Sequence, residues 1–296
     1  MSLELPQRLR RVAFGGLLAT MPLLLSGCSD SQDGYLRRLA EPAASSAEAT
    51  QVHTMWMWSW LAAMIVGVIV WGLIFYVSIR FRRRNEREVP VQTRYNLPIE
   101  IFYTLAPVMV VIVFFYFTLD KQGKISHDDP HPDQTVTVVG QQWAWTFNYG
   151  TGYDSASKSY KHVGSGPQVY EGGTTGDRAT LWLVKDKSVE FNLRSPDVIH
   201  SFWVPAFLYK MDVVPGRHNS FAITPTRAGT FDGRCAELCG VYHSRMRFTV
   251  KVVDQAAYDA HLADLAKQGN TGEALGASMT DRTPGLATPS SSGGNQ

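Results

Sequence analysis

Two long apolar segments without a charged residue most constrain what this chain can fold into. Met55–Ile79 contains 25 residues and Ile101–Leu119 contains 19. As a helix, each is long enough to cross about 30 Å of hydrocarbon. The first begins with three tryptophans, a residue type that gathers at membrane–water interfaces: Trp56, Trp58 and Trp60. The sequence therefore predicts transmembrane helices at 55–80 and 98–120 rather than a pair of buried core helices.

The segment between the two spans, residues 81–97, is rich in arginine. Within it and at its border lie Arg80, Arg82, Arg83, Arg84, Arg87 and Arg94. The flanking segments 29–54 and 120–135 carry two basic residues each. Because short cytoplasmic loops carry the excess of Lys and Arg, we expect this loop in the cytoplasm. The chain is then a multi-pass protein of a bacterial plasma membrane, with 28–54 and everything after the second span outside.

The first 27 residues have the pattern of an export signal. Three arginines precede an uncharged apolar run from Ala13 to Leu25, which is short for a transmembrane helix. The run ends in Leu25-Ser26-Gly27-Cys28, which resembles the lipobox of bacterial lipoproteins, where the cysteine thiol is lipidated and becomes the new N-terminus. A plain signal peptide with an incidental cysteine is the alternative. We expect a lipid anchor on Cys28, followed by an exported linker at 28–54.

The sequence of the exported part predicts an all-β domain at 130–254. Period-2 alternation or short buried runs recur, separated by Pro and Gly, at 134–140, 142–149, 180–184, 188–193, 199–204, 219–224 and 246–253. Several short strands without helical interleaving favour a β-sandwich or barrel. Residues 150–178, rich in Gly, Ser and Tyr, are expected to form an inserted surface loop. A short helix at 255–268 and a disordered tail at 269–296 complete the prediction.

Charge and cysteine content exclude two other classes of protein. The formal net charge is only +2, which is too small for a basic surface that neutralises many phosphates, so no nucleic-acid partner is expected. Three cysteines in 296 residues are too few for a disulfide scaffold.

A cluster of soft metal donors lies near the end of the β domain. Residues 235–246 read CAELCGVYHSRM and contain Cys235, Cys239, His243 and Met246, and His200 precedes them in DVIHSFWVP. Thiolate, imidazole and thioether together suit copper, whereas zinc prefers Cys and His alone. Two bridging thiolates could hold two copper ions, each with one histidine. A disulfide between the two cysteines and a core role for Met246 are the alternatives.

At these residues the chain resembles the cytochrome c oxidase subunit II family. The resemblance covers about residues 50 to 260 and rests on the hairpin, QQWAWTF, DVIHSFWVP, KMDVVPGR and the cysteine loop. It implies a membrane-anchored cupredoxin-like β-sandwich with a dinuclear CuA centre. Its expected role is to accept electrons from a c-type cytochrome and pass them to haem in subunit I, where O2 reduction and proton pumping take place. Subunits I and III and membrane lipid are the implied partners.

The resemblance also implies roles for individual residues. The copper ligands would be His200, Cys235, Cys239, His243, Met246 and the backbone carbonyl of Glu237, whose side chain would reach Mg²⁺ or Mn²⁺ at the subunit I contact. Trp143 would lie where the electron enters, whereas Trp145 suits a core strand. Glu100 would lie near a proton pathway, with a snorkelling helix-end glutamate as the alternative. Asp197 and Asp212 would flank the copper ligand and the subunit I contact.

Three other classes of protein share parts of this pattern. A copper chaperone of the Sco type also has CxxxC, but it has a thioredoxin-like βαβ fold. Nitrous oxide reductase is a much longer protein with many more histidines. A quinol oxidase subunit II has the hairpin and the sandwich but lacks the copper ligands. The lipobox and the long 150–178 loop together resemble the actinobacterial branch. There the donor is a c-type cytochrome tethered to a cytochrome bc complex, so the loop is expected to serve docking within a respiratory supercomplex.

Overall fold

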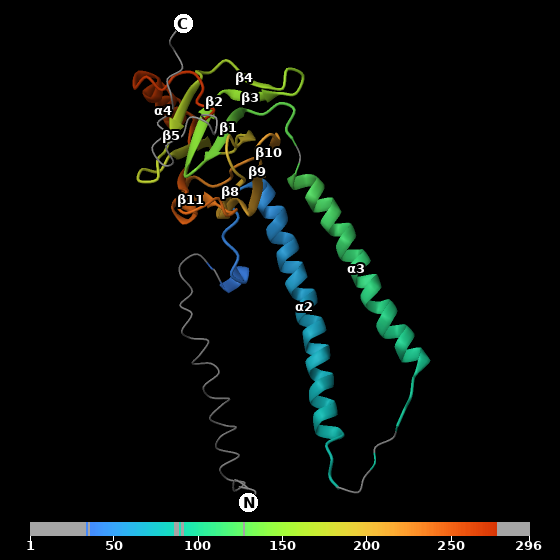
Figure 1. Ribbon diagram of the computed structural model, residues 1–296. Helices are drawn as coiled ribbons and strands as arrows, with labels where there is room; N and C mark the ends of the chain where they lie inside the picture. The colour runs from blue at the N-terminus through green and yellow to red at the C-terminus, as the bar shows by residue number, and fades with distance from the viewer. Residues whose placement is uncertain (1–33, 35, 86–88, 90–91, 127, 277–296) are drawn as a thin grey trace, which may run out of the picture. The chain divides into compact units, whose positions relative to one another are not determined.

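A computed structural model describes residues 34, 36–85, 89, 92–126 and 128–276. Residues up to Ala43 form a unit separate from residues 44–296, and of that first unit the structure describes one turn of 3-10 helix, η1 (Leu36–Arg38). The predicted signal peptide, Cys28, Arg87 and the tail beyond residue 276 lie outside the described residues. Figure 1 shows the second unit, which contains a helical hairpin and a β domain.

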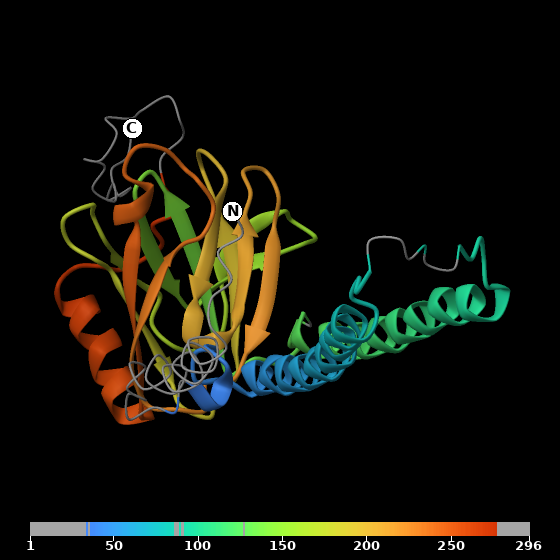
Figure 2. The same ribbon diagram turned by 90° about the horizontal axis from the view of Figure 1, so that it is seen from below.

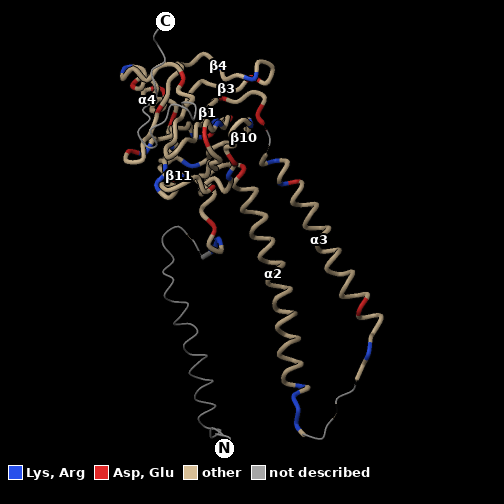
Figure 3. Tube along the Cα trace, in the orientation of Figure 1, with Lys and Arg blue, Asp and Glu red and all other residues tan. Residues whose placement is uncertain are grey.

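Two long helices, α2 (Ala47–Arg80) and α3 (Leu97–Ile125), form the hairpin (Figure 1). Both are long and apolar enough to cross a membrane, and their most apolar stretches are not buried within the protein. α2 begins well before the predicted residue 55, because Ser46 caps it by accepting a hydrogen bond from the Ala49 amide at 3.0 Å. Figure 3 shows the middle of both helices free of charge, with basic residues at the turn end of the hairpin and charged residues at both ends of α3.

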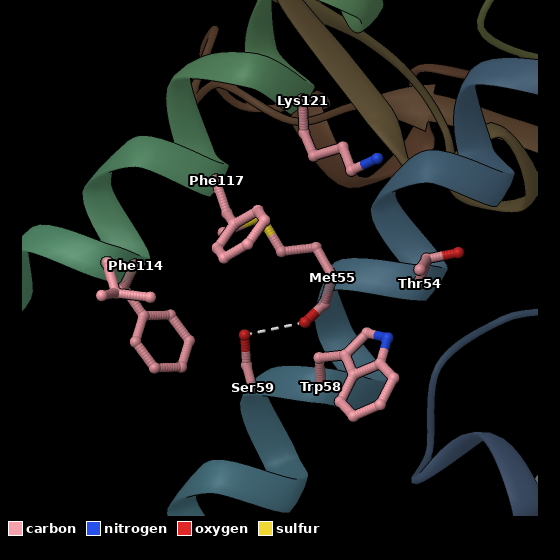
Figure 4. Close-up of a pocket in the computed structure, with 8 residues that line it drawn as sticks. Thr54, Met55, Trp58, Ser59, Phe114, Phe117 and Lys121 are labelled. Atoms are coloured by element: carbon pink, nitrogen blue, oxygen red, sulfur yellow. Dashed lines mark hydrogen bonds between the residues drawn. The ribbon is translucent and has the colours of Figure 1, made fainter. Parts of the chain in front are cut away.

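A small apolar cavity separates part of α2 from α3. It has a volume of about 310 Å³ and is lined mainly by aromatic and aliphatic side chains, among them Met55, Trp58, Phe114 and Phe117 (Figure 4). Lys121 lies at its edge and donates a hydrogen bond to Gln51 Oε1 at 2.9 Å. The two helices are therefore joined by a polar contact near the ends that lie closest to the β domain, and they pack loosely beside it.

The N-terminus of α2 is fixed directly to the β domain. The Thr226 amide donates to the Ser45 carbonyl at 2.9 Å, and the Ala47 amide donates to the Thr224 carbonyl at 3.0 Å. The carboxylate of Glu48 accepts a further hydrogen bond from the Thr224 amide at 3.0 Å. No flexible linker therefore separates the first span from the β domain.

Two five-stranded sheets form the β domain. One has the order β10 (Asn219–Ile223), β7 (Val189–Arg194), β1 (Gln134–Gln141), β2 (Ala144–Tyr149) and β5 (Val169–Gly172). The other has the order β6 (Thr180–Val184), β12 (Arg247–Val253), β11 (Gly229–Cys235), β8 (His200–Val204) and β9 (Tyr209–Val213). Figure 2 shows the strands side by side, with α4 (Gln255–Lys267) along one edge. The predicted fold class, a two-helix hairpin followed by a β-sandwich, is confirmed.

Aromatic side chains fill the space between the two sheets. Phe202 stacks on Phe248 with ring centroids 5.0 Å apart, and Trp145 meets the edge of Phe248 at 5.4 Å. All three are at most 2% exposed, and full burial of one such ring stabilises the fold by about 1.5–3 kcal/mol. Because Trp145 also touches His200, with ring centroids 6.2 Å apart, this core packs directly against the metal-donor cluster.

The prediction that residues 150–178 form a loop without strands is wrong. This segment contains three strands: β3 (Thr151–Asp154) and β4 (Ser159–His162), which form a separate hairpin, and β5, which pairs with β2. The rings of Tyr153 and Tyr160 pair across the hairpin at 5.2 Å. Short strands among Gly and Ser lack the run of alternation that identifies a longer strand. The sequence pattern did not predict β9 or β11 either.

The predicted disordered tail also begins too early. Residues 270–275 lie along the edge of β5 and the adjoining segment, where the Tyr170 amide donates to the Asn270 carbonyl at 3.1 Å. The Asn148 side chain holds Ala274 through two hydrogen bonds of 2.6 and 3.1 Å. Backbone pairing and a buried asparagine, which composition does not reveal, order this segment through residue 276.

Candidate metal centre

Three neighbouring strands bring the soft donors together. His200 begins β8, Cys235 ends β11, and the segment from Cys239 to Met246, which includes η3 (His243–Arg245), leads into β12. β11 pairs with β8 through Cys235 and Phe202 on one side and with β12 on the other. The sheet register therefore places the upstream histidine beside the cysteine loop. His200, Cys235, Cys239 and Met246 are all buried, with at most 5% of each exposed.

Each cysteine has its own set of partners. Cys235 Sγ lies 3.9 Å from His200 Nδ1 and 3.2 Å from the Glu237 carbonyl oxygen. Cys239 Sγ lies 3.6 Å from His243 Nδ1 and 3.7 Å from Met246 Sδ. The two sulfur atoms are 3.9 Å apart, and both cysteines are free thiols. The disulfide alternative is therefore not adopted.

This arrangement fits a pair of soft metal ions. His200, Cys235 and Cys239 offer donor atoms within 4.8 Å of one another. The remaining donors divide evenly around the two sulfur atoms, with an imidazole and an oxygen near Cys235 and an imidazole and a thioether near Cys239. Thiolate, imidazole and thioether are the donors that copper prefers in proteins. A tetrahedral zinc site would leave Met246 and the Glu237 carbonyl without a role.

The two thiols influence each other's protonation. The hydrogen bond from Cys239, helped by His200 and by backbone contacts, holds the pKa of Cys235 well below that of a free thiol. The same contact with Cys235, together with burial, raises the pKa of Cys239. The proximity of the two thiols therefore favours the thiolate form of Cys235 and disfavours that of Cys239.

A buried carboxylate fixes the orientation of His200. His200 Nε2 lies 2.9 Å from Asp197 Oδ1, which leaves Nδ1 facing Cys235. Asp197 is 7% exposed and also accepts hydrogen bonds from the Gln142 and Val198 amides, both at 2.7 Å. Burial lowers the pKa of His200, but the hydrogen bonds with Asp197 and Cys235 outweigh it and raise that pKa overall. A carboxylate–histidine pair of this kind sets the tautomer of a metal ligand.

The two aspartates predicted to flank the copper ligand and the subunit I contact have different surroundings. Asp197 is enclosed within the β domain, where its carboxylate contacts His200, the Ser195 hydroxyl and backbone amides. Asp212 lies on β9 opposite Ser201, and its side chain is exposed. Of the two side chains, only that of Asp212 is exposed at the surface of the β domain.

The two tryptophans of QQWAWTF both bind backbone carbonyls of the metal-donor loop. Trp145 Nε1 donates to the Met246 carbonyl at 3.3 Å and is 1% exposed, as expected for the core strand residue. Trp143 Nε1 donates to the Cys239 carbonyl at 3.2 Å. Trp143 is only 9% exposed, because the ring of Tyr242 stands over it. The aromatic residue expected at the surface is therefore covered.

Gly240 lets the cysteine loop approach this tryptophan. Its φ of +121° lies in a region that favours glycine, and a Cβ there would come within 3.1 Å of Trp143 Cζ2 and 3.2 Å of Gln142 Nε2. Gln142 Nε2 in turn donates to the Cys239 carbonyl at 2.8 Å. Sequence reasoning missed Gln142 and Tyr242, whose only signal is their position beside Trp143 and His243.

The two glutamates of the predicted site lie in different parts of the structure, one beside the cysteines and one at the start of α3. The backbone carbonyl of Glu237 points toward Cys235, while its side chain is exposed. Glu100 lies in the first turn of α3 and accepts a hydrogen bond from the Asn96 amide at 2.8 Å, while Asn96 caps the helix. Glu100 thus supports the start of its own helix and is not brought near the metal donors.

Comparisons with known proteins agree with this architecture. Residues 36–120 match the family model for the cytochrome c oxidase subunit II transmembrane domain, and residues 134–253 match that for its periplasmic domain. The chain is 49% identical to the probable cytochrome c oxidase subunit 2 of Streptomyces avermitilis over 79% of its own length and 81% of the relative's. It is 34% identical to cytochrome c oxidase subunit 2 of Corynebacterium glutamicum, covering 86% and 84% of the two chains.

Among solved structures, the periplasmic domain of subunit II of cytochrome oxidase from Bradyrhizobium japonicum matches 47% of this chain and 97% of its own, with 24% identity and a TM-score of 0.40. The two family models together span most of the chain, and the relatives cover more than two thirds of it. The chain belongs to the cytochrome c oxidase subunit II family.

Proposed function

We propose that the side chains of His200, Cys235, Cys239, His243 and Met246, with the carbonyl of Glu237, hold the dinuclear copper centre of this oxidase subunit. When bound, that centre would accept one electron from a c-type cytochrome and deliver it to haem in subunit I, which supports O2 reduction and proton pumping there. The observation that carries the proposal is the division of donors around two free thiols 3.9 Å apart. As a member of this family, the chain is part of a haem-copper oxidase.

The protein's own residues hold the donors in place and exclude water. Asp197 orients His200, and the Trp145 ring, which packs on Phe248, contacts His200 from the core. Gln142 and Trp143 both bind the Cys239 carbonyl and so fix the second cysteine. Because buried, hydrogen-bonded donors move little, the site needs little rearrangement when its charge changes. It suits electron transfer better than substrate chemistry, since the six donors would all be used to hold the two metal ions.

The β domain would face the extracytoplasmic side, as the name of its family model implies. There the exposed side chains of Glu237 and Asp212 would contact subunit I, with Glu237 reaching a Mg²⁺ or Mn²⁺ ion. Glu100, at the arginine-rich end of the hairpin, would lie near the mouth of a proton pathway. Cys28 would carry a lipid anchor, and subunit III would complete the complex.

The β3–β4 hairpin would contact a cytochrome bc complex in a respiratory supercomplex, with a membrane-bound cytochrome c as donor. β5 belongs to the main sheet, so the part that can be changed is the hairpin tip at residues 155–158, between β3 and β4. Removing the tip should slow coupled quinol oxidation and leave the copper spectrum unchanged. Unchanged coupled turnover would refute the docking role.

The test of the proposed function compares two histidine variants of the full chain purified in detergent. His243→Gln should lower the copper content and abolish electron uptake from a reduced soluble cytochrome c in a stopped-flow experiment. His131→Gln, which changes an exposed histidine outside the cluster, should keep both. If His243→Gln retains full copper and normal uptake, the ligand assignment is wrong.

A further inference from the structure

We propose that Tyr242, and not Trp143, is the aromatic side chain that meets the electron donor, and that it connects the donor to Trp143. This inference rests on the proposed function, since it concerns how an electron reaches the same metal centre. It assigns a docking and electron-transfer role to a residue that the motif pattern does not single out.

Exposure separates the two aromatic rings. Trp143 is 9% exposed, whereas Tyr242 is 41% exposed and lies outside it. The two ring centroids are 5.0 Å apart and the planes are at 87°, so one ring presents its edge to the other. An aromatic pair in this geometry contributes about 0.5–1.5 kcal/mol beyond the area it buries. A donor protein that approaches this face therefore contacts Tyr242 before it can reach the indole.

Tyr242 also completes a continuous contact path from solvent to the metal donors. Its ring touches Trp143, and Trp143 Nε1 donates to the Cys239 carbonyl at 3.2 Å. Electron tunnelling falls steeply across empty space, so a path of touching rings and one hydrogen bond is favoured over a jump through solvent. The donor haem loses one electron and the metal centre gains it. Neither ring is oxidised, and no covalent bond forms or breaks.

The surroundings of Tyr242 have the character of a docking surface for an apolar partner face. Leu238 is 77% exposed and Val241 is 83% exposed on the same loop. Arg245 places its guanidinium 5.4 Å from the centroid of the Tyr242 ring, which holds the ring in place from one side. An exposed aromatic ring within an apolar patch and beside an arginine is the composition of an interface hot spot. The exposed apolar edge of a haem in a c-type cytochrome fits such a patch.

Three substitutions separate docking from electron transfer. Tyr242→Phe keeps the ring, Tyr242→Leu keeps an apolar surface without the ring, and Tyr242→Ala removes both. The matched control is Tyr95→Ala, which changes a tyrosine that is 74% exposed in the segment between the two helices. Each full-length variant is mixed with a photoreduced soluble monohaem cytochrome c. Binding is measured with the copper-free protein, and the transfer rate with the copper-loaded protein at saturating cytochrome.

We expect Tyr242→Ala to weaken binding about thirtyfold, as removal of an aromatic hot spot does, and to slow transfer at saturation. Tyr242→Leu should bind more tightly than Tyr242→Ala but transfer as slowly, whereas Tyr242→Phe and the Tyr95 control should match the wild type. Wild-type transfer in Tyr242→Ala would overturn the inference, because the uncovered Trp143 would then suffice. So would a changed copper spectrum in all three Tyr242 variants, since Tyr242 would then act on the site itself. If the wild type shows no copper spectrum at all, the proposed function fails instead.

Discussion

Replacing Asp197 by asparagine should weaken copper binding without removing a ligand. Asp197 Oδ1 faces three donors, His200 Nε2 at 2.9 Å, Ser195 Oγ at 3.1 Å and the Val198 amide at 2.7 Å, while Oδ2 faces the Gln142 amide at 2.7 Å. An asparagine that keeps its oxygen toward His200 must turn its NH2 group toward the Gln142 N–H. One buried donor is then unpaired, and His200 loses a charged acceptor.

The magnitude of this change follows from both losses. Loss of the carboxylate partner of a metal-binding histidine costs about 10–100-fold in metal affinity, which corresponds to about 1.4–2.7 kcal/mol. The unpaired Gln142 amide should separately destabilise the metal-free fold by about 1–3 kcal/mol. The affinity is measured by competition with a copper chelator, followed by copper–thiolate absorbance, and the stability by thermal unfolding of the metal-free chain.

Asp212→Asn is the matched control, since Asp212 has an exposed side chain on the neighbouring strand β9. It should leave both the copper affinity and the unfolding midpoint close to those of the wild type. If Asp197→Asn binds copper as tightly as the control does, the carboxylate does not orient His200 and the reasoning is refuted.

Three further predictions concern other parts of the β domain. Burial and the neighbouring Asp128 carboxylate raise the pKa of Glu190 to about 7, although a hydrogen bond from the Asp129 amide opposes the shift. The stability that this raised pKa contributes is complete below about pH 4.5 and is lost as the pH rises through 7. Glu190→Gln should therefore stabilise the fold at pH 8 by up to about 3 kcal/mol and little at pH 4, and equal effects at both pH values in thermal unfolding would contradict this. Met246→Leu, a change of similar volume, should leave the fold intact and shift the reduction potential of the copper-loaded protein, and an unchanged potential in spectroelectrochemistry would remove Met246 from the ligand set. Gly164→Ala is the control for Gly240→Ala, because both glycines have a positive φ (+83° and +121°) but only a Cβ at 240 meets neighbours within 4 Å. Gly240→Ala should destabilise the protein by about 1–3 kcal/mol more, the cost of overpacking, and equal unfolding midpoints would show that the close approach to Trp143 is unimportant.

The sequence predicted the parts of the fold that rest on long patterns. Two uncharged apolar runs predicted α2 and α3, and alternation predicted strands such as β6 and β12, whose residues alternate between buried and partly buried. The hairpin β3–β4 and the edge strand β5 could not be predicted in the same way. They are four residues long, and they depend on cross-strand pairs and on the segment after α4, which the local sequence does not report.

The candidate site likewise has a part that the local sequence predicts and a part that it does not. The spacing of Cys235, Cys239, His243 and Met246 made the donor set recognisable, because all four come from one loop. The environment of these donors depends on residues far away in the sequence, such as Asp197 and Gln142, and on the packing of aromatic rings against one another. The sequence therefore placed Trp143 at the surface, whereas Tyr242 covers it in the folded domain.

The central claim is that two thiols of this chain bridge two copper ions. Electron paramagnetic resonance of the copper-loaded full chain, combined with its copper content, tests this claim most directly. We predict two copper ions per chain that share one unpaired electron, with hyperfine coupling to two equivalent copper nuclei. One copper ion per chain, with coupling to a single nucleus, would contradict the account.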